Sequence, residues 1–155
     1  MSEKCPDCGA ILKEDVSCQT IFDSLLVLEF SDPAYSAVHM LTVACFMIQH
    51  RRYSDEALNW IEQKLRDNLE EGIPAEQIRR LAAKETNLSK RTWKVTRRPN
   101  DPPLPKIAWS MTIADVAIHY QEANSYNNLV RKWARITLNE MTPYLSKFKR
   151  PTYPD

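Results

Sequence analysis

The stretch that decides the fold is residues 18–50, which read CQTIFDSLLVLEFSDPAYSAVHMLTVACFMIQH. Apolar side chains recur at helical spacing over its first part, and they occupy nearly every side of its last part. Between the parts, Asp32 can act as an N-cap and Pro33 suits the first position of a new helix. The stretch therefore predicts two helices, 18–30 and 34–50, that form an antiparallel hairpin with the second helix in the middle of the molecule.

The rest of the chain predicts further helices around this hairpin. Ser54 can cap the next helix, and Pro74 can start the one after it. Thr112 can cap a later helix, and the last one, about 126–142, is expected to end before Pro143 because proline cannot continue a helix. The fold class predicted is all-α: a five- to six-helix bundle with a short N-terminal zinc-knuckle-like segment.

The chain has 155 residues and a mass of 18.0 kDa, enough for one ordinary domain over residues 1–155. It contains only 2 glycines, too few for a phosphate-binding P-loop, a dinucleotide-binding fingerprint or the nucleophile elbow of α/β-hydrolases. These enzyme classes are therefore excluded. Four segments are expected: a Cys knuckle over 1–17, helices over 18–87, a basic proline-rich loop over 88–111, and C-terminal helices over 112–145.

No targeting or membrane signal is visible in the sequence. No apolar stretch follows a basic beginning after Met1, and the most apolar segment, 37–48, is far shorter than the roughly 20 residues of a bilayer span. Four cysteines without a secretion signal favour reduced thiols or metal ligands in a reducing compartment. A cytoplasmic protein with no membrane partner is expected.

The sharpest motif is the pair of cysteines in Cys5-Pro6-Asp7-Cys8-Gly9. Two thiolates at this spacing can turn toward one ion, and the glycine after the second allows a tight turn. Structural zinc takes four ligands, and Cys18 is the obvious third because the N-terminus of a helix favours a thiolate. The motif therefore predicts a zinc ion that holds the N-terminal segment against the helical hairpin.

The fourth ligand is expected from the end of the second helix of the hairpin. If facing residue numbers sum to about 64, Cys18 faces residue 46 and lies near Cys45 and His50. We expect His50 to be the fourth ligand because its longer side chain at a helix end can turn to the ion. Cys45 is the substitute, although a small core residue is its commoner role.

His39 lies about 16 Å along the helix from His50, so one ion cannot bind both histidines. Because eleven residues are close to three whole turns, the two share a helix face. His39 is therefore expected either to lie next to the metal ligands without binding the ion, or to be a hydrogen-bonded core histidine.

With these residues in place, the chain resembles an uncharacterised bacterial family, a domain of unknown function. That family has a CPxCG-like knuckle, a C-x3-F-x2-LL-x2-E-like helix, an H-x-LTV-x-C-x3-QH-like helix, a W-x-MT-x-x-DV motif and a WA-containing helix. The resemblance implies one helical unit and a set of linked Cys and His positions, but no activity. One departure is Arg51, where the family commonly has proline. The matching residues are Cys5 to Gly9, Cys18 with Phe22, Leu25, Leu26 and Glu29, His39 to Cys45 with Gln49 and His50, Trp109 to Val116, and Trp133 with Ala134.

Two weaker patterns carry less specific hypotheses. Residues 79–98 combine eight basic side chains with Trp93, which suits nucleic acid, but docking on the acidic segment 54–77 of the same chain is the favoured interpretation. His119 lies four residues after Asp115 on one helix face, and a surface pair is favoured over a catalytic dyad.

The leading functional hypothesis is a zinc-binding helical protein of unknown biological role, a binding or adaptor module with a structural metal and a protein partner. The alternative is a metal-dependent hydrolase with an open zinc site, in which the base is His50, His39 or Glu29. It ranks lower because three thiolates blunt the Lewis acidity of the ion, so an enzyme is not favoured. Nucleic-acid binding through 79–98 ranks third. The sequence does not predict the oligomeric state.

Overall fold

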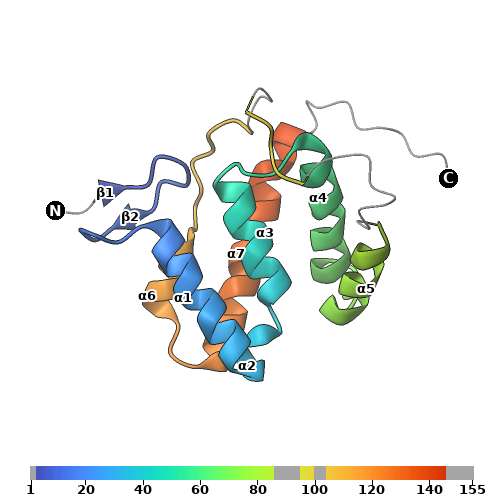
Figure 1. Cartoon of the computed structure of the whole chain (residues 1–155), viewed down its shortest axis with the longest axis horizontal. Helices are drawn as coiled ribbons and strands as arrows, with labels where there is room; N and C mark the ends of the chain where they lie inside the picture. Colours follow the sequence, from blue (N-terminus) through green and yellow to red (C-terminus); the bar gives the residue numbers. More distant parts are fainter. Residues whose placement is uncertain (1–2, 86–94, 100–103, 146–155) are drawn as a thin grey trace.

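The structure, a computed structural model, describes residues 3–85, 95–99 and 104–145. Over these residues the chain is mostly helical, with seven helices and one two-stranded sheet (Figure 1). The all-α expectation is thus confirmed. The elements are β1 (Glu3–Lys4), β2 (Ile11–Leu12), α1 (Cys18–Ser31), α2 (Pro33–Ser36), α3 (His39–Gln49), α4 (Asp55–Leu69), α5 (Ala75–Glu85), α6 (Ile113–His119) and α7 (Ala123–Leu145).

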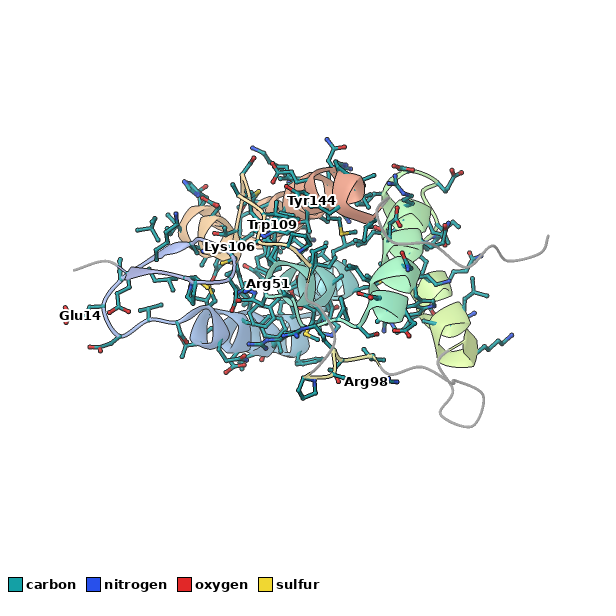
Figure 2. The ribbon with its side chains drawn as sticks, turned by 90° about the horizontal axis from the view of Figure 1, so that it is seen from above. Glu14, Arg51, Arg98, Lys106, Trp109 and Tyr144 are labelled. Carbon is teal, nitrogen blue, oxygen red and sulfur yellow. The ribbon has the colours of Figure 1, made fainter. Side chains whose placement is uncertain are left out.

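Helices α3 and α7 form the middle of the molecule and pack against each other (Figure 1). Helices α1 and α6 lie on the side of the small sheet, and α4 and α5 lie on the opposite side. The central position of α3 agrees with its sequence, since its side chains at Ala44, Cys45 and Phe46 have no exposed surface. Trp133 and Tyr126 of α7 are buried just as completely. Viewed from above, Glu14 lies at the outer end of the N-terminal segment, and Arg51 lies toward the middle (Figure 2).

Three details differ from the sequence expectation. The helix expected over 34–50 is divided into α2 and α3, because Val38 leaves the helical conformation (ψ 13°) and places its side chain in the core. Helix α7 passes through Pro143 to Leu145, so the predicted stop before this proline is wrong. Burial of the Leu145 side chain offsets the free energy lost with the backbone hydrogen bond that Pro143 cannot donate. The strands β1 and β2 have two residues each and show no alternating pattern that could have predicted them.

No helix in the described part of the chain has both the length and the apolar character that a membrane span needs.

Helix α1 begins with a capping box that places Cys18 at its first position. The Ser17 hydroxyl accepts a hydrogen bond from the Thr20 backbone N–H (3.1 Å), and the Thr20 hydroxyl accepts one from the Ser17 N–H (3.1 Å). We expect Ser17→Ala to lower the free energy of unfolding by about 1 kcal/mol in urea denaturation, because one helix donor loses its acceptor. Ser17→Asp keeps an acceptor at this exposed position and should change the stability by less than half as much; equal losses would contradict the capping role.

Candidate metal centre

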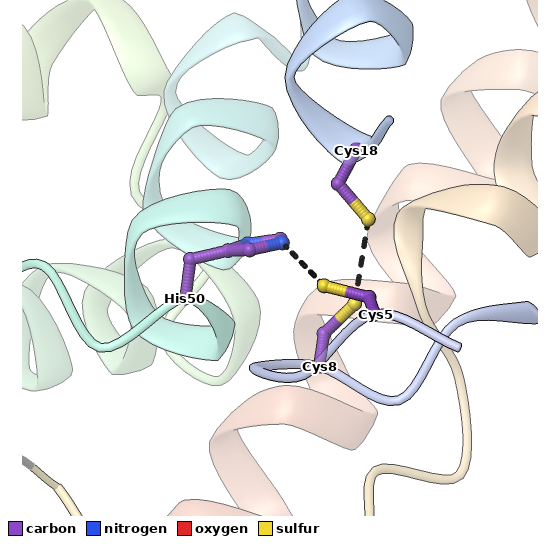
Figure 3. A group of neighbouring side chains, drawn as sticks. All are labelled: Cys5, Cys8, Cys18 and His50. Carbon is purple, nitrogen blue, oxygen red and sulfur yellow. Dashed lines mark hydrogen bonds between the residues drawn. The ribbon is translucent and has the colours of Figure 1, made fainter. Parts of the chain in front are cut away.

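Four side chains converge from three separate parts of the chain (Figure 3). Cys5 and Cys8 come from the loop between β1 and β2, Cys18 is the first residue of α1, and His50 follows the last residue of α3. One ligand atom from each residue lies within 4.8 Å of all the others. All four residues are at least nine-tenths buried, with exposed fractions between 2% and 7%. The described residues thus contain a buried Cys3His group that could hold a metal ion.

The distances within this group match the edges of a tetrahedron around zinc. The Sγ atoms of Cys8 and Cys18 are 3.6 Å apart, and Cys5 Sγ lies 3.7 Å from His50 Nε2. Zinc–sulfur bonds of about 2.3 Å and a zinc–nitrogen bond of about 2.0 Å place neighbouring ligand atoms about 3.5–3.8 Å apart in a tetrahedron. These two pairs therefore need little movement to become tetrahedral neighbours around one ion.

The loop that carries Cys5 and Cys8 is held by its own backbone. The Gly9 N–H donates to the Cys5 carbonyl (3.0 Å), and the Cys5 N–H donates to the Ala10 carbonyl (2.8 Å). Gly9 has φ +82°, a left-handed conformation that other residues adopt only with strain. The glycine after the second cysteine therefore provides the tight turn that the motif predicted.

The helix that precedes His50 fixes the orientation of its imidazole ring. Its Nδ1–H can donate to the Phe46 carbonyl (2.8 Å), which leaves Nε2 directed at the cysteines. A backbone carbonyl on the second ring nitrogen is the usual companion of a metal-bound histidine, because it fixes the tautomer and the ring orientation. The Phe46 ring packs on the imidazole at 4.3 Å and is itself stacked on Phe22 at 3.9 Å.

The thiols interact strongly with one another. The hydrogen bond from the Cys18 thiol, opposed by burial and helped by the neighbouring His50, lowers the pKa of Cys8 to about 4. The same hydrogen bond, together with burial and the nearby sulfurs of Cys8 and Cys5, raises the pKa of Cys18. The buried group thus favours one thiolate and disfavours a second, so a cation is required if all three sulfurs are to be ionised together.

A surface ion pair holds the cysteine loop to the end of α3. Arg51 donates from Nη2 to Asp7 Oδ1 at 2.9 Å. Arg51 has φ +56°, which a proline ring cannot adopt, so the local backbone of this chain differs from the QH-proline pattern of the resemblance. The pair is partly exposed on both sides and contributes at most about 1 kcal/mol.

The register of the helical hairpin explains why His50 reaches the group. Cys18 lies with His50, Phe22 stacks on Phe46, and Glu29 bonds His39. Facing residue numbers therefore sum to 68 and not to the expected 64, a shift of about one helical turn. The separate helix α2 lengthens the connection between α1 and α3 and accounts for this shift.

Cys45 and His39 lie outside the group. Cys45 is completely buried in the core, where loss of solvation raises the pKa of its thiol to about 12. His39 is at the opposite end of α3 from His50 and donates from Nδ1 to Glu29 Oε1 at 2.7 Å. The structure thus places His39 away from the Cys3His group and in a hydrogen bond with Glu29, which agrees with the second of its two expected roles.

Glu29, which the sequence suggests only as a possible catalytic base, is the centre of a buried polar network. Its side chain has no exposed surface. Besides His39, Thr42 donates a hydrogen bond to it (2.6 Å), and so does the Tyr126 hydroxyl. Burial, followed by this hydrogen bond to Glu29, raises the pKa of Tyr126. The position of Glu29 on the same helix face as Phe22 and Leu25 was the available signal, because a carboxylate there must be buried with partners.

The structure describes the whole of the Asp115–His119 pattern but only part of the basic stretch 79–98. His119 bonds the backbone carbonyl of Asp115 (2.8 Å), while the Asp115 carboxylate accepts from the Thr112 N–H, so no Asp–His side-chain pair forms. Of the basic stretch 79–98, residues 86–94 lie outside the described residues.

None of the four Cys and His residues lines the pocket that Arg79 and Arg131 line, or the pocket that Ile107 and Tyr144 line. The ligand group therefore does not open onto either pocket.

A family model described as a family of unknown function (DUF5946) matches residues 3–142, a range that includes all four residues of the group. Neither a curated protein nor a solved structure matches the chain.

Proposed function

We propose a structural zinc site for this chain, which belongs to the family of unknown function DUF5946. The ligands are Cys5, Cys8, Cys18 and His50. The observation that carries the proposal is the convergence of these four buried ligand atoms within 4.8 Å, at spacings that suit tetrahedral zinc. Thiolates with one imidazole favour zinc over magnesium or calcium, which prefer oxygen ligands.

The metal has a structural role in this proposal because protein ligands fill all four coordination positions. A catalytic zinc keeps a position open for water or substrate. The burial of the group and the absence of its residues from the linings of both described pockets support a closed site. The same observations remove support from the alternative of a metal-dependent hydrolase. Its other suggested bases, His39 and Glu29, are engaged with each other at the far end of α3.

The biological role then lies on the surface, as a binding or adaptor module for a protein partner. Helix α1 supports this role, because Val27 and Phe30 are 65% and 74% exposed and lie one turn apart on the same face. Large apolar side chains gathered on an exposed helix face are typical of protein-binding surfaces.

Cobalt substitution tests the closed zinc site. We expect the protein to bind one equivalent of Co²⁺, with intense visible bands of tetrahedral geometry and a thiolate-to-metal charge-transfer band, and one equivalent of Zn²⁺ to displace it. Azide should leave the spectrum unchanged, since no ligand position is open to it. A spectrum that shifts with azide would instead indicate an open position and support the hydrolase alternative.

A further inference from the structure

A pocket of about 380 Å³ is lined by residues of the α2–α3 junction, of the α4–α5 turn with α5, and of α7. The start of α3 and the passage from α4 to α5 lie away from the N-terminal sheet (Figure 1). The pocket volume falls within the range of about 300–1,000 Å³ that is typical of small-molecule sites. The pocket is therefore large enough for a small organic ligand.

The turn between α4 and α5 forms a rigid wall of this pocket. The Asn68 side-chain amide donates to the Ile73 carbonyl (3.0 Å), and the Ile73 N–H donates to the Asp67 carbonyl (2.9 Å). Gly72, between them, has φ +70°. Because these bonds are made within the chain itself, the wall does not depend on a ligand for its shape.

The lining combines an apolar floor with two positive charges. The apolar lining residues Met40 and Ile73 are partly exposed, and Pro74 is exposed. Arg79 of α5 and Arg131 of α7 reach the pocket from different helices, and neither has an ion-pair or hydrogen-bond partner among the residues that the structure describes. Glu76 also lines the pocket, but it is engaged by Arg80 at 2.8 Å. The two guanidinium groups are therefore available to an anionic group, and the floor to an apolar one.

We infer that this pocket binds a small amphiphilic anion, a carboxylate or phosphate monoester carried on a short apolar chain. The apolar chain lies on Met40, Ile73 and Pro74, and the two arginines hold the charged oxygens. Neither feature alone selects this class: an apolar floor accepts neutral molecules, and a pair of exposed arginines accepts inorganic ions. This inference is independent of the zinc site, which lies at the other end of α3.

Amide NMR titration of the zinc-loaded chain with octanoate, octyl phosphate and n-octanol tests the inference. Both anions should shift the amides of Gly72, Ala75 and Arg131 in a saturable way, with dissociation constants of about 0.1–1 mM. Octanol, which has the same chain without the charge, should bind at least about tenfold more weakly. A preference between the two anions identifies the headgroup.

The variants Arg79→Met and Arg131→Met keep most of the side-chain length and remove the charge. Each should weaken binding of the anions by about tenfold. Arg135→Met, an exposed position one turn further along α7 that does not line the pocket, is the matched control and should leave binding unchanged. The inference is overturned if octanol binds as tightly as the anions, or if all three variants weaken binding equally. It is also overturned if the shifted amides lie elsewhere, or if no amide shifts at millimolar concentrations.

Discussion

Replacing Cys8 with serine is expected to abolish stoichiometric zinc binding and to lower the free energy of unfolding by on the order of 5 kcal/mol. Cys8 is 2% exposed, and its sulfur lies 3.6 Å from that of Cys18 at the point where the N-terminal loop meets α1. Because β1 and β2 pair with each other, the loop without a metal is held to the helices by one partly exposed ion pair and by the buried side chains of Ala10 and Leu12. The binding free energy of the ion is therefore a large part of what keeps the loop on the hairpin.

Cys45→Ala is the matched control for this experiment. It removes another fully buried cysteine, one that the sequence alone kept open as a substitute ligand. We expect it to retain one zinc per chain and to cost about 1 kcal/mol through the small cavity that it leaves. Metal content by mass spectrometry and urea denaturation of both variants give the comparison. Loss of zinc from Cys45→Ala, or full zinc content in Cys8→Ser, would contradict the ligand assignment.

Replacing Glu29 with glutamine is expected to destabilise the fold by about 2–4 kcal/mol without reducing the zinc content. The carboxylate accepts hydrogen bonds from His39, Thr42 and Tyr126 where no solvent reaches it. An amide offers only one oxygen, which can keep Thr42 and Tyr126 only if the NH2 group faces His39 Nδ1 and that nitrogen changes from donor to acceptor. The loss should be large because these bonds involve a charged acceptor.

Asp23→Asn on the same helix is the control for Glu29→Gln. Asp23 is exposed and accepts one hydrogen bond from Gln19, so its replacement should change stability by less than about 0.5 kcal/mol. Midpoints and slopes of urea denaturation measure both variants. If Glu29→Gln lowers the free energy of unfolding by no more than the control does, the network does not contribute to stability as described.

The helices were largely predictable because their signals are local. The side chains of Ser54 and Asp32 cap α4 and α2, and the Asp115 carboxylate accepts from the Thr112 N–H at the start of α6. The break at Val38 was not predictable in this way, because it follows from packing of the Val38 side chain in the core. The passage of α7 through Pro143 likewise depends on burial of Leu145 and not on helix propensity.

The metal group shows both what spacing can predict and where it fails. The motif and the helix start gave Cys5, Cys8 and Cys18, and an antiparallel hairpin brought the end of α3 to them. The hairpin register could not be obtained from helix length alone, since it depends on the extra turn of α2. A shift of one turn decides whether Cys45 or His50 lies beside Cys18, so the sequence-based preference for His50 depended on the reach of its side chain and not on the register.

X-ray absorption at the zinc edge, on the full chain purified without chelators, tests the central claim most directly. The account predicts one zinc per chain, with three sulfur neighbours at about 2.3 Å and one nitrogen neighbour at about 2.0 Å. The absence of zinc, or a shell in which oxygen and nitrogen outnumber sulfur, would contradict it.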